Sequence, residues 1–342
     1  MGRAPSFTTI GPAEIMAPLP PIAWHVQGLR LAPGAAIAFC GYGFSGKSLI
    51  AQSVALSVAA GRHLFGLFYA RQGRALYVDY DGQGARLSRE RFQRLARGQG
   101  ISAQDLGDRL HLATLPNVFL DGSGEAIEAA FDGYQLVVVD ALRGAAPSLD
   151  ENSSEIRKAI DRLNRASEKS NATVILVHHA RKPAQGTDDA LSPFSMRGSS
   201  AIFDACASVF MFGVKKDEPI RVRQTKCRLT GTPLPEFGIR IEDVAEGDER
   251  RAGLRLVHLD AEQLEQVQSA EGASARVSRR ILEALGGYAD GFAGTKNELL
   301  AKLGGNRQAF LDALRQLEEG GQVTLSAKPP VIRRAGAPTG SR

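Results

Sequence analysis

The sequence predicts an α/β protein with a mainly parallel sheet flanked by helices, followed by a small, mostly helical domain. Between residues 24 and 260, short apolar runs alternate with helical patterns, which is typical of a parallel sheet. A glycine-rich segment at 41–48 lies between the first such run and the first helix. Of the 342 residues, 43% are apolar and 23% are charged, so the chain is globular and not disordered.

Composition excludes several classes of protein. Cys40, Cys206 and Cys227 lie far apart, which excludes a disulfide framework and the usual zinc-finger spacing and fits a reducing cytosol. No apolar run approaches the ~20 residues of a membrane span, and the first 21 residues have no signal-peptide core. We therefore expect a cytoplasmic protein that makes no membrane contact.

Apolar runs and helical spacing place the elements of the large domain. The expected strands are 35–41, 73–82, 108–115, 134–140, 172–179 and 208–214, with an antiparallel meander at 220–228, 237–243 and 254–260. The expected helices are 49–61, 85–98, 154–170 and 199–207. The strands 35–41 and 172–179 are expected to be buried, and 134–140 has a continuous apolar run, which is typical of a parallel strand.

Five segments are expected along the chain. Residues 1–23 are an arm rich in Pro and Ala, 24–260 the α/β domain, 261–275 a polar linker, 276–334 a small domain, and 335–342 a flexible tail. The small domain has the pattern of three helices with a Gly-Gly break and then a hairpin. This order resembles a winged-helix domain.

The net charge of +5 is unevenly distributed. From Glu271 onward there are 11 Lys and Arg against 7 Asp and Glu, and the rest of the chain is nearly neutral. A basic domain on a neutral body suggests contact with an anionic polymer, although a merely solvated surface is the alternative. In a winged helix, the helix that begins near Asn306 would enter the DNA major groove, with Arg307 and Arg315 as contacts.

The segment GYGFSGKS at 41–48 matches the phosphate-loop pattern GxxxxGK[ST] between a strand and a helix. We expect its three glycines to adopt dihedrals that are closed to other residues. Its N–H groups would cradle phosphates, Lys47 would reach the β- and γ-phosphates, and the Ser48 hydroxyl would ligate Mg²⁺. The predicted nucleotide-binding residues are Gly41, Gly43, Phe44, Ser45, Gly46, Lys47, Ser48, Leu49 and Asp140.

Polar residues end three of the expected strands. Asp140 follows a continuous apolar run and would hold Mg²⁺ through water. Hydrolysis also needs a carboxylate that orients the attacking water. Asp79 and Asp81 share one strand face, and we favour Asp81 because it lies further out; the alternative is that both are turn or cap residues. His178 and His179 point to opposite faces, so only one can contact the γ-phosphate.

Together these segments resemble the RecA-like core of P-loop ATPases, over residues 24–230. Within that core they are most similar to the RepA-like plasmid replicative helicases and their AAA-family relatives. The residues that carry the resemblance are CGYGFSGKS, ALYVDYDGQ, LVVVDALRGAAPSLDENSSE, VILVHHARK and MRGSSAIFDACASVFMF. The resemblance implies a hexameric ring or a filament with ATP bound between subunits.

The resemblance also implies roles for single residues. The carboxylate at the Asp81 position is the catalytic base, usually Glu and here shorter by one methylene. The phosphate sensor falls on His179. Arg197 matches a region that supplies a basic residue to the neighbouring site. TKCR resembles a Lys-x-Arg finger, which places Lys226 and Arg228 at the γ-phosphate of the adjacent subunit.

In such rings the loop 181–196 lines the central channel, which makes Arg181 and Lys182 candidate contacts to single-stranded DNA. The leading hypothesis is an ATP-hydrolysing, DNA-associated ring motor, namely a replicative helicase of a plasmid, phage or integrated element. The alternative is a DNA-binding regulator or loader that hydrolyses ATP slowly without unwinding. A third class, a small-molecule or nucleotide kinase, lacks a lid or acceptor-pocket signal.

Overall fold

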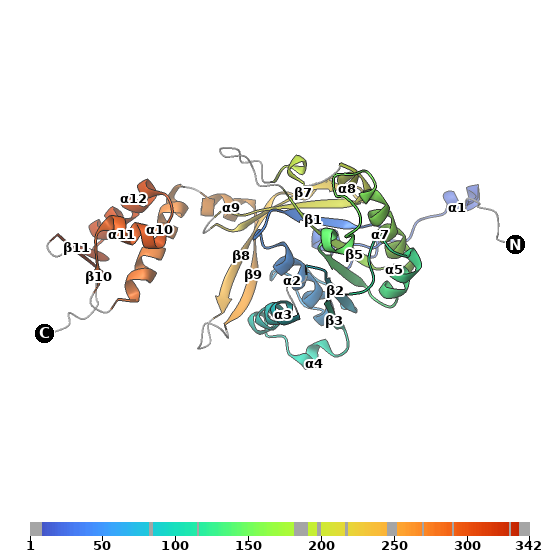
Figure 1. Ribbon diagram of the computed structural model, residues 1–342, viewed down its shortest axis with the longest axis horizontal. Helices are drawn as coiled ribbons and strands as arrows, with labels where there is room; N and C mark the ends of the chain where they lie inside the picture. The colour runs from blue at the N-terminus through green and yellow to red at the C-terminus, as the bar shows by residue number, and fades with distance from the viewer. Residues whose placement is uncertain are drawn as a thin grey trace.

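The computed structural model shows an α/β body with a separate C-terminal unit at one side and the N-terminal segment at the other (Figure 1). The residues that it describes are 9–81, 85–114, 116–180, 191–196, 200–215, 218–244, 252–268, 270–288, 291–327 and 330–334. Among these residues, no helix combines the length and the apolar character needed to cross a membrane.

The body is built on a nine-stranded sheet with the order β3-β2-β4-β5-β1-β6-β7-β8-β9. The strands are β1 (Ile37–Gly41), β2 (Ala75–Asp79), β3 (Leu110–Thr114), β4 (Leu136–Asp140), β5 (Thr173–His179), β6 (Ser208–Gly213), β7 (Ile220–Cys227), β8 (Phe237–Val244) and β9 (Gly253–Leu259). Strands β1 to β6 are parallel, and β7, β8 and β9 continue the sheet antiparallel. The predicted α/β architecture, with its meander at the sheet edge, is confirmed.

Helices cover both faces of the sheet because side chains alternate along each buried strand. Ile37 and Phe39 of β1 pack with α2 (Lys47–Ala60) and α3 (Ala85–Gln99). Ala38 and Cys40 pack on the opposite face. The helices on that face are α5 (Gly124–Phe131), α6 (Leu142–Ala145), α7 (Ile156–Ser170) and α8 (Ser200–Ala205). The shorter helices are α1 (Pro12–Ile15), η1 (Gln27–Leu29), α4 (Ala103–Leu106) and η3 (Pro193–Ser195).

Parallel pairing brings the functional strand ends to one edge of the sheet. Gly41 of β1 pairs with His179 of β5, and Asp79 of β2 pairs with Asp140 of β4. Strand β5 lies between β1 and β4. The residues that follow these strands therefore face a common space at the carboxyl edge, where open α/β sheets bind their ligands.

The C-terminal unit has its own hydrophobic core, which includes Ile281, Leu299, Phe310 and Ile332. Its elements are α10 (Ala270–Gly286), β10 (Phe292–Ala293), α11 (Lys296–Leu303), α12 (Arg307–Glu319), β11 (Val323–Ala327) and β12 (Pro330–Arg334). The three strands form a sheet in the order β10-β12-β11. Helices and hairpin agree with the sequence pattern, whereas the two-residue strand β10 has no clear sequence signal.

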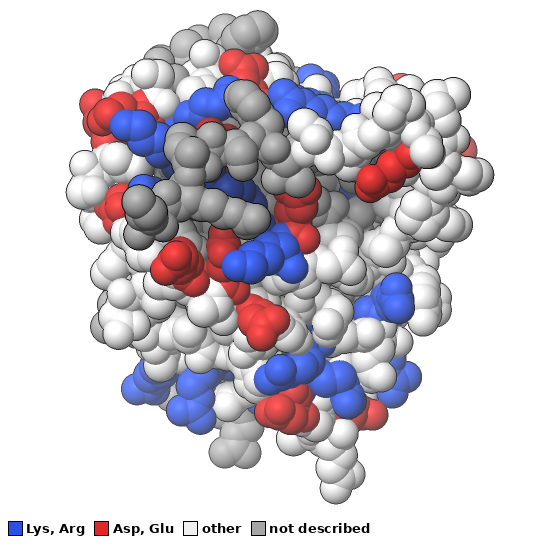
Figure 2. Space-filling view, turned by 90° about the vertical axis from the view of Figure 1, so that its right-hand side faces the viewer, with Lys and Arg blue, Asp and Glu red and all other residues white. Residues whose placement is uncertain are grey.

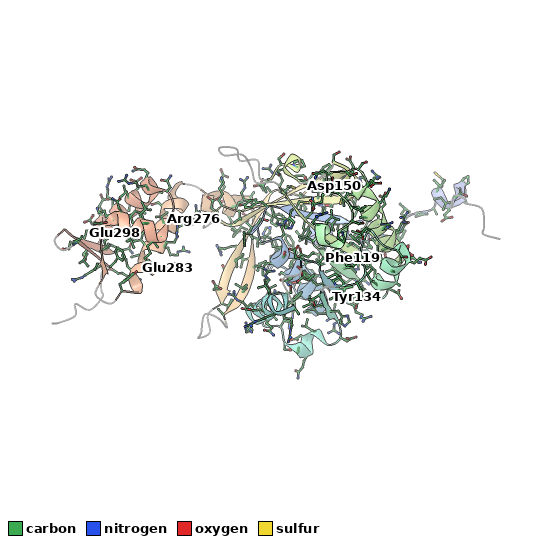
Figure 3. All side chains as sticks on the ribbon, viewed as in Figure 1. Phe119, Tyr134, Asp150, Arg276, Glu283 and Glu298 are labelled. Atoms are coloured by element: carbon green, nitrogen blue, oxygen red, sulfur yellow. The ribbon has the colours of Figure 1, made fainter. Side chains whose placement is uncertain are left out.

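The segment 261–275, expected to be a polar linker, is largely helical. It forms α9 (Ala261–Gln268) and the start of α10, because Glu, Gln and Ala favour a helix even without a long apolar face. Leu264 of α9 is buried against Gly238 of β8. Arg276, labelled in Figure 3, lies 3.7 Å from Glu218 of the body as an ion pair.

Candidate nucleotide-binding site

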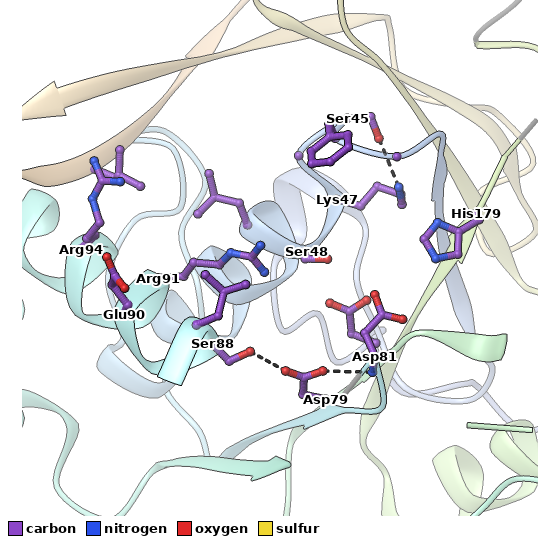
Figure 4. Close-up of a pocket in the computed structure, with 17 residues that line it drawn as sticks. Ser45, Lys47, Ser48, Asp79, Asp81, Ser88, Glu90, Arg91, Arg94 and His179 are labelled. Carbon is purple, nitrogen blue, oxygen red and sulfur yellow. Dashed lines mark hydrogen bonds between the residues drawn. The ribbon is translucent and has the colours of Figure 1, made fainter. Parts of the chain in front are cut away.

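A pocket of about 480 Å³ lies at the carboxyl edge of the sheet (Figure 4). Its walls come from the loop before α2, the ends of β2, β4 and β5, one face of α3, and β9. The lining residues are Gly43, Phe44, Ser45, Gly46, Lys47, Ser48, Leu49, Asp79, Asp81, Leu87, Ser88, Glu90, Arg91, Arg94, Asp140, His179 and Leu254. All the predicted nucleotide-binding residues except Gly41 thus share one pocket.

Glycine is required at two of the three phosphate-loop positions, for different reasons. Gly46 has φ 81° at the N-cap of α2, a conformation that only glycine adopts easily. A Cβ at Gly41 would lie 2.6 Å from the carbonyl oxygen of Phe212. Gly41 and Gly43 correct our expectation about dihedral angles, because neither has a positive φ, and a Cβ at Gly43 would meet nothing within 4 Å. Phe44, the residue after Gly43, has a left-handed conformation instead, with φ 64°.

Lys47 is folded onto its own loop. Its Nζ donates to the carbonyl oxygen of Tyr42 at 2.7 Å and to the hydroxyl of Ser45 at 3.3 Å. Burial lowers the pKa of Lys47, while the nearby carboxylates of Asp140 and Asp81 oppose that shift. A triphosphate in the loop would offer this ammonium stronger acceptors than a carbonyl and a hydroxyl.

Asp140 and Ser48 form an oxygen-rich corner at the end of β4. The Asp140 carboxylate is buried and accepts hydrogen bonds from the hydroxyls of Tyr77 and Ser48. Burial raises the pKa of Asp140, the two hydrogen bonds oppose the shift, and the charges of Asp81 and Asp79 add to it. A carboxylate and a hydroxyl beside two further carboxylates form a hard-oxygen donor set, which fits Mg²⁺.

The two carboxylates after β2 have different environments. Asp79 is only 6% exposed, and both its oxygens are occupied: Oδ1 accepts from the Asp81 N–H at 3.1 Å and Oδ2 from the Ser88 hydroxyl at 2.6 Å. Asp81 is exposed and lines the pocket (Figure 4). Asp79 is therefore placed to hold the loop and the start of α3, and Asp81 is the carboxylate turned toward the ligand space.

The two histidines at the end of β5 also differ. His178 is buried in the body, whereas His179 lines the pocket opposite Lys47 (Figure 4). Neighbouring strand residues point to opposite faces, so this division follows from the strand itself. Of the pair, His179 alone is placed to meet a bound phosphate.

Helix α3 contributes residues that the sequence analysis missed. Arg91 and Arg94 line the pocket, and the Arg91 side chain extends toward Ser48 (Figure 4). Arg94 is held by Asp243 at 2.9 Å and by the carbonyl oxygen of Ala252 at 3.1 Å. No hydrogen bond or ion pair joins Arg91 to another residue within the described part of the chain. Helical spacing from Leu87 was the available signal, since 87, 91 and 94 share one face.

Lys226 and Arg228 lie away from this pocket. Cys227, the last residue of β7, pairs with Ser208 of β6, and Ser208 pairs with Ile37 at the start of β1. The end of β7 therefore lies at the opposite edge of the sheet from the phosphate loop, which follows the end of β1. The Lys226 ammonium donates to the carbonyl oxygen of Asp204 at 3.1 Å, and the Arg228 guanidinium donates to the same oxygen at 2.6 Å. Burial, with the charge of Arg228 adding, lowers the pKa of Lys226.

Other predicted contacts are placed only in part. Arg197, Arg181 and Lys182 lie outside the described residues. Arg307 and Arg315 are exposed on α12 of the C-terminal unit. The two arginines are eight residues apart, close to two helical turns, so one face of α12 presents both.

A strand, a glycine-rich turn with a lysine, and a buried acidic strand end define the class of P-loop nucleotide-binding proteins. The family model described as AAA domain matches residues 4–185, more than half of the chain, and the chain belongs to that family. It is a P-loop ATPase. Among solved structures, the crystal structure of the RadB recombinase is similar with a TM-score of 0.43 and 18% sequence identity, covering 66% of this chain and 93% of that chain.

Proposed function

We propose that this P-loop ATPase is a DNA-associated motor of the RepA-like helicase type, in which ATP is bound between subunits of a hexameric ring or a filament. The observation that carries the proposal is the convergence of Lys47, Ser48, Asp81, Asp140 and His179 on one pocket. These residue types at these strand ends supply a phosphate cradle, a metal site, a water-orienting carboxylate and a phosphate sensor.

Each residue has a role in the proposed reaction. The loop N–H groups and Lys47 bind the β- and γ-phosphates. Asp81 accepts a hydrogen bond from the attacking water and takes its proton as the water oxygen bonds to the γ-phosphorus. The bond from the γ-phosphorus to the bridging oxygen breaks in the same step, and that oxygen leaves with ADP. His179 contacts the γ-phosphate and responds to its loss. Ser48 and Asp140 would hold Mg²⁺, which when bound neutralises charge on the phosphate oxygens.

Arg91 adds a cationic group from the same chain. Its guanidinium is directed toward Ser48 and lacks an acidic partner among the described residues. We infer that it donates to a phosphate oxygen, because a planar guanidinium forms strong bidentate hydrogen bonds with phosphate. The Asp79–Ser88 hydrogen bond would keep α3, and therefore Arg91, in register with Asp81.

The neighbouring-subunit role of Lys226 and Arg228 is consistent with their position. At the opposite edge of the sheet they are too far away to reach the phosphate loop of their own chain. The alternative is that they only cap the last turn of α8, whose carbonyl groups they bind. Arg197, outside the described residues, would contribute to the same interface.

Mixing of variant subunits distinguishes a role of Arg228 in the neighbouring subunit's site from a role that only caps α8. Arg228→Ala should abolish hydrolysis but retain nucleotide binding, and Lys47→Ala should lose both. If the finger acts in trans, a mixture of the two variants regains part of the activity, because some sites combine an intact loop with an intact finger. A mixture no more active than its components would show that Arg228 does not serve a neighbour.

DNA binding is proposed at two places. The loop with Arg181 and Lys182 would contact single-stranded DNA in the channel. The C-terminal unit, whose element order and three-stranded sheet support a winged helix, would bind duplex DNA through Arg307 and Arg315. On the face shown in Figure 2, the basic and acidic groups of the described residues are intermixed, so these residues form no continuous basic track there.

Paired assays test the function. We expect hydrolysis of ATP to be stimulated by single-stranded DNA, and a forked duplex to be unwound. DNA-stimulated hydrolysis without strand separation would favour the second candidate, a DNA-binding regulator or loader. Two features favour that candidate: Asp81 in place of the longer Glu, and the added C-terminal unit.

A further inference from the structure

The carboxylate of Asp140 can serve a metal ion well only if it is held in one orientation. Asp140 is the last residue of β4, and it lines the nucleotide pocket although it is only 5% exposed. The last side-chain torsion of an aspartate is weakly restricted, because it joins an sp³ carbon to an sp² carbon. The orientation of this carboxylate is therefore set by the groups that bond its oxygens.

Tyr77 of β2 supplies one of these groups from the interior of the protein. Its hydroxyl donates to Oδ2 of Asp140, and its side chain is only 1% exposed. Asp140 lines the pocket, whereas Tyr77 is not among the described residues that do so. The hydroxyl therefore approaches the carboxylate from the core and not from the pocket.

Strand register and packing hold Tyr77 in this position. In the parallel pairing of β2 with β4, Tyr77 lies beside Val138, and Asp140 follows two residues later on the same strand face. The ring of Phe92 in α3 meets the Tyr77 ring edge-on, with 5.5 Å between the ring centroids, and both rings belong to one core cluster. A phenylalanine at position 77 would fill the same space but could not donate to Asp140.

We propose that Tyr77 is a positioning residue for the metal site, whose hydroxyl holds the Asp140 carboxylate in the orientation that binds Mg²⁺ together with Ser48. The proposal rests on the proposed function, since it assumes a nucleotide with Mg²⁺ at the phosphate loop. Partners of metal ligands fix the orientation of those ligands, and their loss typically lowers metal affinity about tenfold to a hundredfold. Tyr77 acts through Asp140 and touches neither the metal nor the nucleotide.

Calorimetric binding of the β,γ-imido analogue of ATP, measured once with Mg²⁺ and once with EDTA, tests the proposal. The ratio of the two affinities reports on the metal site separately from the phosphate loop. Tyr77→Phe should lower this ratio about tenfold and leave the affinity in EDTA unchanged. Tyr80→Phe is the matched control, because the Tyr80 hydroxyl donates to the carbonyl oxygen of Val118 instead; it should keep the wild-type ratio.

A double variant asks whether Tyr77 acts through Asp140. Asp140→Ala should itself lower the ratio, and adding Tyr77→Phe should lower it no further, because the carboxylate that the hydroxyl orients is gone. A further loss in the double variant would overturn the proposal.

The single variant gives two more outcomes that would overturn it. One is a wild-type ratio in Tyr77→Phe. The other is equal weakening with Mg²⁺ and with EDTA, which is what a merely structural role of Tyr77 predicts. A wild-type chain that does not bind the analogue, or binds it no better with Mg²⁺, would instead contradict the proposed function, and the role of Tyr77 with it.

Discussion

At the scale of single residues, the two carboxylates after β2 have separable tasks. Asp81→Asn should reduce ATP hydrolysis at least about a hundredfold while nucleotide binding persists, because the variant cannot accept a proton from water. Asp79→Asn should reduce stability as well as activity, since its carboxylate bonds both the Asp81 N–H and Ser88. Hydrolysis rates together with thermal unfolding distinguish the two. Full hydrolytic activity of Asp81→Asn would exclude Asp81 as the catalytic base.

Arg91 is expected to contribute to phosphate binding. Arg91→Ala should lower kcat/KM for ATP by about tenfold to a hundredfold, through loss of a charge-assisted hydrogen bond. Arg89→Ala is the control, because Arg89 is exposed on the same helix and does not line the pocket. Equal kinetics for the two variants would contradict the role given to Arg91.

At the scale of elements, His25 ties the N-terminal segment to the start of β5. Its Nδ1 lies 2.7 Å from the Thr173 hydroxyl, and burial lowers its pKa from 6.5 to about 4. The folded state therefore binds this proton less readily than the unfolded chain. The neutral imidazole stabilises the fold above pH 6.5, and that stability is lost as the pH falls toward 4.

Denaturant unfolding at several pH values measures this effect. Between pH 6.5 and 4, the wild type should lose on the order of 3 kcal/mol more of its free energy of unfolding than His25→Gln does. The difference between the two proteins isolates His25 from the other titrating groups. Parallel pH profiles would show that His25 does not titrate with folding.

The packing of α3 on β9 depends on Gly98. Gly98→Ala places a methyl group against the backbone of Leu254 and should destabilise the body by about 1–3 kcal/mol or more. Gly124→Ala, in α5, is the matched control: nothing lies within 4 Å of its Cβ position, so alanine should be neutral or stabilising there. Denaturant unfolding compares them, and equal stabilities would argue against close contact.

The helices and strands were easier to predict from the sequence than the contacts between them. The parallel strands, the phosphate loop, and Asp140 at a strand end follow from local apolar runs and one motif. Arg91 was missed because its role depends on how α3 packs, which no local pattern specifies. Leu254 was missed because β9 meets α3 only in the folded chain. Gly43 was assigned a conformation that Phe44 adopts instead, since the motif fixes residue types and not each dihedral angle.

At the scale of the whole molecule, the C-terminal unit has its own core and two exposed arginines on α12. If it binds duplex DNA, the double variant Arg307→Ala with Arg315→Ala should weaken binding and reduce the slope of log K against log salt by about 2. Arg279→Ala with Lys296→Ala removes the same charge from exposed sites elsewhere in the unit. Indistinguishable salt slopes for the two double variants would contradict duplex binding through α12.

The central claim is that the loop carrying Lys47 binds a nucleoside triphosphate which the pocket then cleaves. Steady-state ATP hydrolysis with Mg²⁺, for the wild type and for Lys47→Ala, tests it most directly. Lys47 supplies an ammonium group to the pocket. Without it, the β- and γ-phosphates lose the main positive charge that the protein provides for them. We predict measurable turnover by the wild type and at least about a hundredfold loss in Lys47→Ala. Equal rates in the two proteins, or no turnover by the wild type, would contradict the claim.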